Sequence, residues 1–86
     1  MASVEQVRAG IAAATEKINE GIAALQQAAT AIEQAQSAFA ATAQGSSQSD
    51  AEQVQGLLAQ ALQGINDAQQ TASAAISTAE SYAARL

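Results

Sequence analysis

Large apolar residues recur at a strict spacing of seven along the first half of the chain. The row comprises Val4, Ile11, Ile18, Leu25, Ile32 and Phe39. Small residues stand three positions after its members, at Ala14, Gly21, Ala28 and Ala35, with Val7 heading the series. A helix brings residues at alternating spacings of three and four onto one side. The pattern therefore predicts a long helix with a coiled-coil-like seam of alternating large and small residues.

The second half of the chain carries a row of the same kind. It comprises Val54, Leu58, Ala61, Ile65, Ala68, Ala72, Ala75, Ala79, Tyr82 and Leu86. Between the two rows, residues 44–49 read Gln-Gly-Ser-Ser-Gln-Ser and break the pattern. We therefore predict an all-α fold with a single domain over 1–86. It consists of a helix at about 4–43, a loop at 44–49 and a helix at about 50–86.

Local signals mark the ends of both predicted helices. Ser49 followed by Glu52 has the form of a capping box for the second helix, and Ser3 with Gln6 repeats it more weakly for the first. Gly45 can adopt the left-handed conformation that ends a helix.

Folding the chain about the loop pairs the two rows into an antiparallel hairpin. If residue i faces residue 93 − i, Ile11 meets Tyr82 and Leu25 meets Ala68, while Ala28 meets Ile65. Large residues then mostly face small ones, which allows the two helices to approach closely. Gly21 falls in a layer with almost no side chain, and close approach by the second helix or by another chain would explain a glycine in a helix interior.

A second apolar stripe runs beside the predicted seam. Leu62, Ile76 and Ala83 lie on one flank of it in the second helix, and Leu57 lies on the other. Ile22 and Ala29 lie beside the seam of the first helix. The stripe is interpreted either as a widened core or as a docking face for a second hairpin. We predict the docking face, formed by Ile22, Leu57, Leu62 and Ile76, and dimerisation into a four-helix bundle.

Composition narrows the functions that are open to the chain. Alanine supplies 25 of the 86 residues, proline is absent, and the net charge is −5 with three basic residues. Sparse cations disfavour binding to nucleic acid or to an anionic membrane. The chain has no His and no Cys, which removes the usual general base, metal ligand and thiolate nucleophile. We predict no enzymatic activity, no catalytic residue, no cofactor and no metal.

The first ten residues and the hydropathy of the chain indicate where the protein is located. Residues 1–10 contain no apolar segment of the signal-peptide kind, and no stretch reaches the ~18 apolar residues of a membrane span. We expect a protein without a membrane span, either cytoplasmic or exported without a cleaved signal peptide.

The hairpin layout over the whole chain resembles the WXG-type small proteins of type VII (ESX) secretion. The turn here contains Gly45 without a Trp, and Tyr82 is followed four positions later by Leu86 where that family has an acidic residue. The chain is also similar to uncharacterised Ala-rich hairpin proteins of actinobacteria, which end in a comparable Tyr-x-Ala-Arg-Leu. The resemblance implies a dimerising adaptor or a secretion-linked partner.

Two functions follow from these observations. The first is a non-catalytic interaction module that binds a second copy or another helical protein, with a link to type VII secretion. The alternative is a phasin-like coat, in which the hairpin opens and lays its apolar stripe on a hydrophobic particle, because a seam made mostly of Ala is weakly held.

Overall fold

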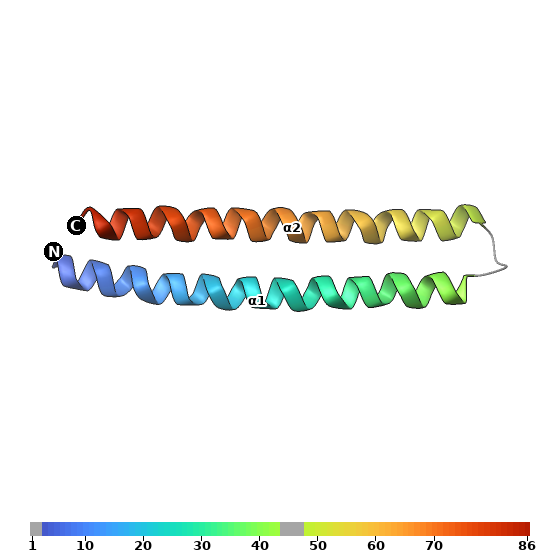
Figure 1. The fold of residues 1–86 in the computed structure, drawn as a ribbon, viewed down its shortest axis with the longest axis horizontal. Helices are drawn as coiled ribbons and strands as arrows, with labels where there is room; N and C mark the ends of the chain where they lie inside the picture. Colours follow the sequence, from blue (N-terminus) through green and yellow to red (C-terminus); the bar gives the residue numbers. More distant parts are fainter. Residues whose placement is uncertain (1–2, 44–47) are drawn as a thin grey trace.

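The protein folds as a hairpin of two long helices that lie side by side and run in opposite directions (Figure 1). The structure, a computed structural model, describes residues 3–43 and 48–86. Helix α1 spans Val4–Thr42 and helix α2 spans Gln48–Ala84. No strand is present among the described residues. The predicted all-α hairpin is confirmed, and both termini lie at the end opposite the connection between the helices (Figure 1).

The first helix begins at the capping box that the sequence predicts. The Gln6 amide donates to the Ser3 hydroxyl at 3.1 Å, and the Ser3 amide donates to Gln6 Oε1 at 3.0 Å. These two bonds satisfy backbone donors that the first turn of a helix cannot pair. At the other end the Ala43 amide donates to the Phe39 carbonyl at 2.8 Å.

The second helix begins earlier than the sequence indicates. Ser49 was expected to precede the first turn, but it lies inside α2, which already starts at Gln48. The predicted cap at Ser49 is therefore wrong. The left-handed turn expected at Gly45 lies outside the described residues. At its far end α2 stops at Ala84, two residues short of the predicted Leu86.

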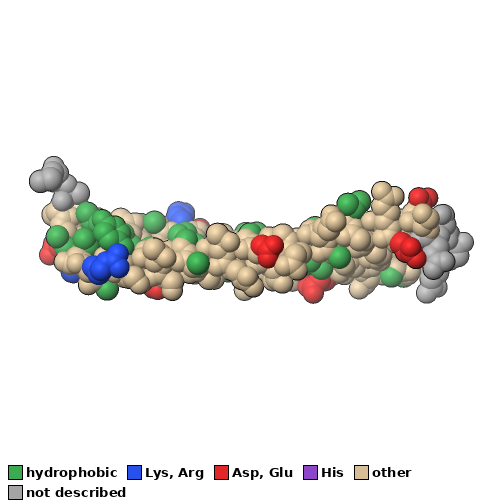
Figure 2. Space-filling view, turned by 90° about the horizontal axis from the view of Figure 1, so that it is seen from above, with side chains coloured by type: hydrophobic (Ala, Val, Ile, Leu, Met, Phe, Trp, Pro, Cys, Tyr) green, Lys and Arg blue, Asp and Glu red, His purple; other side chains and the backbone are tan. Residues whose placement is uncertain are grey.

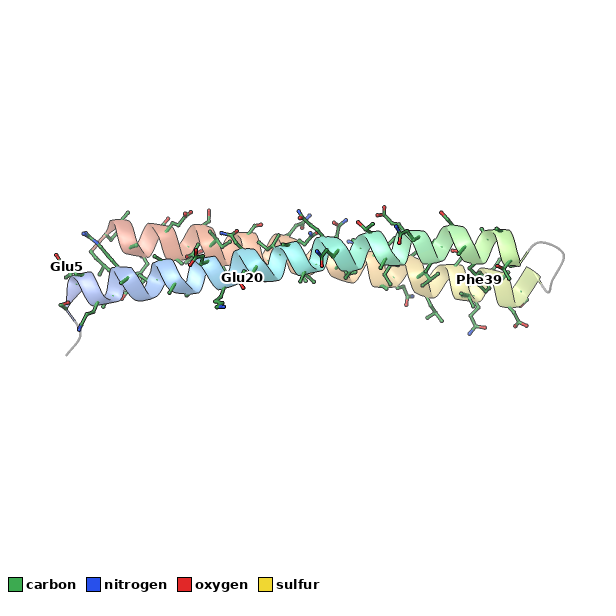
Figure 3. The ribbon with its side chains drawn as sticks, turned by 90° about the horizontal axis from the view of Figure 1, so that it is seen from below. Glu5, Glu20 and Phe39 are labelled. Atoms are coloured by element: carbon green, nitrogen blue, oxygen red, sulfur yellow. The ribbon has the colours of Figure 1, made fainter. Side chains whose placement is uncertain are left out.

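A stripe of half-buried side chains on each helix forms the seam between them. On α1 and its C-cap residue Ala43 the stripe comprises Val7, Ile11, Thr15, Ile18, Ile22, Leu25, Ala29, Ile32, Gln36, Phe39 and Ala43. On α2 it comprises Ala51, Val54, Gln55, Leu58, Leu62, Ile65, Gln69, Ala72, Ile76, Ala79 and Ala83, and Leu86 beyond the end of the helix continues it. Figure 3 shows Phe39 near the loop end of this seam and Glu5 at the opposite end.

Half of the predicted seam is wrong. The seven-spaced large residues of α1 do face α2, apart from Val4, which stays 48% exposed at the open end. Their companions in the seam, however, lie four positions later and not three. The expected companions are exposed instead: Ala14, Gly21, Ala28 and Ala35 on α1, and Ala61, Ala68, Ala75 and Tyr82 on α2.

The seam takes the later positions because they cover more apolar surface than the earlier positions would. Residues three and four positions after a given residue lie on opposite flanks of it, so a helix can turn toward one or the other. Turning toward the later position covers Ile22 on α1 and Leu62 and Ile76 on α2. Turning toward the earlier one would cover mainly alanine and glycine. The hydrophobic effect scales with buried apolar area and favours the first choice.

The register between the helices also differs from the predicted one. Gln55 Nε2 donates to the Gln36 carbonyl oxygen across the seam at 3.0 Å. The numbers of these two residues sum to 91, whereas the predicted pairing has a sum of 93. The shift follows from the rotation, because each helix presents a different set of residues to its partner.

The seam is too thin to enclose a core. No described residue is fully buried. The accessible surface is 6054 Å², whereas a compact monomer of 8.6 kDa is expected to expose about 4,700 Å². The Cα radius of gyration is 19.4 Å, against about 12 Å for a compact chain of this length. A single hairpin therefore leaves much of its apolar surface in contact with water.

The seam predicts the effect of replacing Leu62 and Ile76 together with Gln. Because both side chains pack between the helices, the double substitution should lower the free energy of unfolding by about 2–4 kcal/mol. Urea denaturation followed by far-ultraviolet circular dichroism measures this loss. Gln27→Ala on the exposed outer side of α1 is the control, with a change within about 0.5 kcal/mol. If the double variant unfolds at the same urea concentration as the parent, these residues do not lie in the seam.

Candidate interaction surface

The four residues predicted to form a docking face do not come together. Ile22, Leu62 and Ile76 are half-buried along the seam, as the widened-core interpretation expects. Leu57 alone is clearly exposed, with 58% of its surface accessible. Three of the four residues are thus occupied by contacts within the hairpin, and a binding surface must be sought elsewhere.

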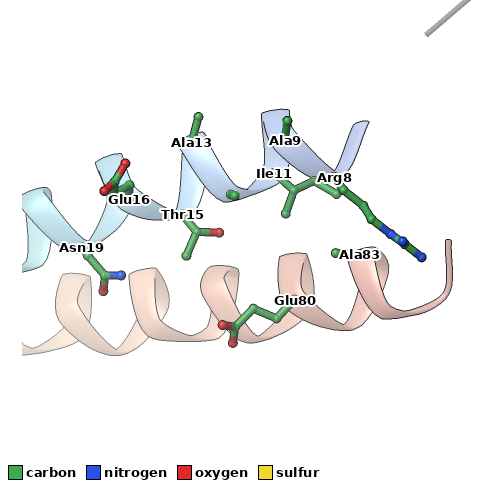
Figure 4. A pocket seen from close by; sticks show the side chains of 10 residues that line it. Arg8, Ala9, Ile11, Ala13, Thr15, Glu16, Asn19, Glu80 and Ala83 are labelled. Atoms are coloured by element: carbon green, nitrogen blue, oxygen red, sulfur yellow. The ribbon is translucent and has the colours of Figure 1, made fainter. Parts of the chain in front are cut away.

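One side of the hairpin is polar, and the polar flanks of both helices meet on it. A hollow there is lined by Asn19 of α1 and Glu80 of α2, and another by Gln26 of α1 with Asn66 and Ser73 of α2. Figure 4 shows the first hollow, with Ile11 and Thr15 directed toward α2 while Ala13 and Glu16 point away from it. We call this the polar side.

The opposite flanks of the two helices form the other side of the hairpin, which we call the small-residue face. On α1 it comprises Gly10, Ala14, Lys17, Gly21, Ala24, Ala28, Ala31, Ala35 and Ala38. On α2 it comprises Asp50, Val54, Leu57, Ala61, Gly64, Ala68, Thr71, Ala75, Thr78, Tyr82 and Arg85. All of these residues are exposed except Val54, which is half-buried.

The small-residue face carries two of the largest exposed apolar side chains. Leu57 lies toward the loop end, and Tyr82, which is 47% exposed, lies toward the termini. Tyr82 lines a shallow hollow together with Thr71, Ala75 and Thr78. The space-filling view from the α2 side shows that hydrophobic side chains gather near the termini, while acidic side chains are spread along the length of the hairpin (Figure 2).

Charge is divided unequally between the two sides. Among the described residues, Asp50 is the only acidic residue on the small-residue face, and the other seven acidic residues lie elsewhere. Two of the three basic residues, Lys17 and Arg85, lie on this face. Lys17 Nζ is 3.5 Å from Glu20 Oε1, but both side chains are largely exposed and the pair adds little stability.

Glycines distinguish the small-residue face further. Of the four described glycines, Gly10, Gly21 and Gly64 lie on it, and a Cβ added at any of them would meet no atom within 4 Å. Close approach by α2, one of the two explanations expected for Gly21, is therefore wrong. Each interior glycine costs about 1 kcal/mol relative to alanine. Gly56, which lies off this face, is equally open, so no contact within the hairpin accounts for any of the four described glycines.

The seam itself contains polar groups that weaken it. Thr15 Oγ1 is buried, and among the described residues it has no hydrogen-bond partner. By contrast, Thr30, Thr42 and Thr71 donate to the carbonyl four residues earlier. Gln69, which is half-buried in the seam, lines a hollow that Ile22 also lines. Such groups lower the stability of a seam but favour one register over its neighbours.

The described residues hold little that resembles a chemical site. They contain no cluster of three or more potential metal-ligating side chains. Neither helix, over the same residues, is long and apolar enough to cross a membrane. The hollows are shallow and lie along the outside of the hairpin.

Comparisons with known protein families, with curated proteins and with solved structures find no match for this chain. The resemblance to WXG-type proteins therefore remains a prediction from the sequence.

The polar seam generates a prediction at Gln69. Leucine at this position would add apolar contact beside Ile22, so Gln69→Leu should raise the free energy of unfolding by about 1 kcal/mol and the Tm by about 4–8 °C. A thermal melt by circular dichroism measures the shift. Gln70→Leu, one position away on the polar side, is the matched control and should give no comparable increase. Equal shifts in the two variants would contradict the seam assignment.

Proposed function

We propose that this protein is a non-catalytic interaction module that binds a helical protein surface through its small-residue face. The hairpin acts as a straight support, and the face provides backbone that a partner can approach closely. The observation that carries the proposal is the coincidence on one side of Leu57, Tyr82 and three of the four described glycines, among side chains that are nearly all small and exposed.

The apolar surface that a partner would bury supports the same proposal. A partner laid along the small-residue face would cover Leu57 and Tyr82 and would also shield the edge of the seam beneath them. Small residues suit such a contact because helices with alanine and glycine at the interface can pack at short distances. Few charges need to be desolvated, since seven of the acidic side chains lie off this face. A link to type VII secretion is part of this proposal only through the resemblance of the sequence.

A second candidate function is a coat on a hydrophobic particle. The observation that favours it is the thin seam, in which no described residue is fully buried, so that opening the hairpin is inexpensive. This function requires the helices to separate and the seam residues to contact the particle. The interaction module keeps the hairpin closed, and hydrogen exchange at seam amides on added hydrophobic particles distinguishes the two.

The proposed module predicts where the protein is contacted in the cells that produce it. A photo-crosslinking amino acid placed at Thr71, on the small-residue face, should form adducts with a protein on irradiation. The same amino acid at the neighbouring Gln70, on the polar side, is the control and should give few. Denaturing electrophoresis followed by mass spectrometry measures both. Equal labelling from the two positions, or none from Thr71, would contradict the proposed surface.

A further inference from the structure

Two rows of positions compete for the seam of the hairpin. Both are counted from the seven-spaced row of α1 and from its counterpart on α2, which comprises Ala51, Leu58, Ile65, Ala72, Ala79 and Leu86. The four-later row comprises Thr15, Ile22, Ala29 and Gln36 on α1, and Gln55, Leu62, Gln69, Ile76 and Ala83 on α2. The three-later row comprises Val7, Ala14, Gly21, Ala28 and Ala35 on α1, and Val54, Ala61, Ala68, Ala75 and Tyr82 on α2. The seam of the structure, which we call the present seam, uses the four-later row along most of its length.

The present seam changes row near both ends of the hairpin. Val7, a member of the three-later row, is half-buried at the start of α1, where Arg8, four positions after Val4, is exposed. Near the loop end Val54 and Gln55, one from each row, are both half-buried. A single pair of helices therefore accepts both rows as packing surfaces.

The four-later row brings polar groups between the helices. Thr15 is directed toward α2 (Figure 4), and its buried Oγ1 has no hydrogen-bond partner among the described residues. Gln69 is half-buried in the same row, and Gln55 Nε2 donates to the Gln36 carbonyl oxygen. The three-later row contains no amide side chain and only the phenol of Tyr82 as a polar group. The apolar contact that favours the present seam is therefore opposed by the cost of its polar groups.

Turning both helices toward the three-later row produces a second seam with its own register. At 100° per residue, the centre of the contact on each helix moves by about 50°, and a change of two in the sum of paired residue numbers is a slide of about 3 Å. The sum becomes 93, so that Ile65 faces Ala28 and Tyr82 faces Ile11. Large residues face small ones in most layers of this second seam, which suits close packing.

We propose that the hairpin is a two-state device, in which rotation of both helices exchanges the present seam for the second seam. In the present seam the small-residue face is open. In the second seam its inner members, among them Ala68 and Tyr82, enter the contact between the helices, while Thr15, Ile22 and Ile76 turn toward water. The inference rests on the proposed function, because it supplies the regulation of the same face.

The exchange controls access to the small-residue face. Its outer members, including Lys17, Leu57 and Arg85, lie beyond the three-later row and stay exposed in both states, so no charge is desolvated by the rotation. A partner that needs the inner members binds only the present seam. Such a partner shifts the population toward the present seam by as much as its affinity differs between the two states.

Leucine placed in the emptiest layers of the second seam should favour that state. Ala14 and Gly21 are exposed in the present seam, whereas in the second seam they lie in layers with almost no side chain. Ala14→Leu with Gly21→Leu therefore adds apolar contact within the hairpin only in the second seam. Ala13→Leu with Gly56→Leu, one alanine and one glycine outside both rows, is the matched control. Far-ultraviolet circular dichroism verifies that both variants keep their helices.

Two probes report the rotation in opposite directions. Tyr82 is the only tyrosine in a chain without tryptophan, so its fluorescence is measured without other emission. Its quenching by acrylamide should fall about twofold in the leucine pair, because a side chain that is now 47% exposed enters the seam. Thr15→Cys, added to each variant, supplies a single thiol. Its labelling by a maleimide should rise about threefold to tenfold in the leucine pair, in proportion to the population in which position 15 leaves the seam.

Only rotation protects Tyr82 and exposes position 15 together. Association through the small-residue face would protect Tyr82 but leave position 15 buried, and unfolding would expose both. Protection without faster labelling, faster labelling without protection, or no change relative to the control pair overturns the second seam. Should the leucine pair lose its helices, Ala14→Leu alone, with Ala13→Leu as its control, should show a smaller shift in the same two directions.

The photo-crosslinking amino acid at Thr71 separates this inference from the proposed function. If the two probes do not move together while the Thr71 adduct forms, the second seam is overturned and the interaction module stands. If the probes move together and no adduct forms, the two seams stand and the proposed function is overturned. If both hold, the adduct yield should fall in the leucine pair, and an undiminished yield would overturn control of the face by the seam.

Discussion

The structure depends on a single strip of contact, the seam between α1 and α2. Every other property of the hairpin follows from which residues enter that strip. Two helices of this composition have few large side chains, and most of them lie in the seam: the seven-spaced row of α1 apart from Val4, Ile22, and Leu58, Leu62, Ile65 and Ile76 of α2. Even so, no described side chain is fully covered, because two helices alone cannot surround a residue.

The seam also decides the chemistry of the two sides. Once the helices turn toward Ile22 and Ile76, most acidic and amide side chains fall on the polar side and the outward surface of the hairpin, apart from Asp50 and the three glutamines of the seam. The alanines and glycines that flank the seam on the other side are left without a partner. A surface of small residues is therefore the consequence of optimising the seam, and it is flat, weakly charged and open to close approach.

Stability and association are coupled in such a molecule. Burying Leu57 and Tyr82 against a partner adds apolar contact that the hairpin cannot obtain by itself, and it offsets the cost of glycine within the helices. The buried Thr15 hydroxyl, which has no hydrogen-bond partner among the described residues, reduces the stability of the isolated hairpin further. A protein built in this way gains more from a partner than a compact domain of the same length would.

The sequence by itself determined the two helices, their antiparallel pairing and the cap at Ser3, because these depend on local signals: propensity, spacing and the Ser3–Gln6 exchange of hydrogen bonds. It did not determine which flank of the seven-spaced row faces the partner helix. Within one helix, Gly21 and Ile22 flank the seven-spaced row equally well, because they lie three and four positions after Ile18. The choice between them is made by the apolar area that both helices bury together, including Leu62 and Ile76, some forty or more residues away in the chain. The register and the small-residue face followed from that choice, so only the tertiary structure decided them.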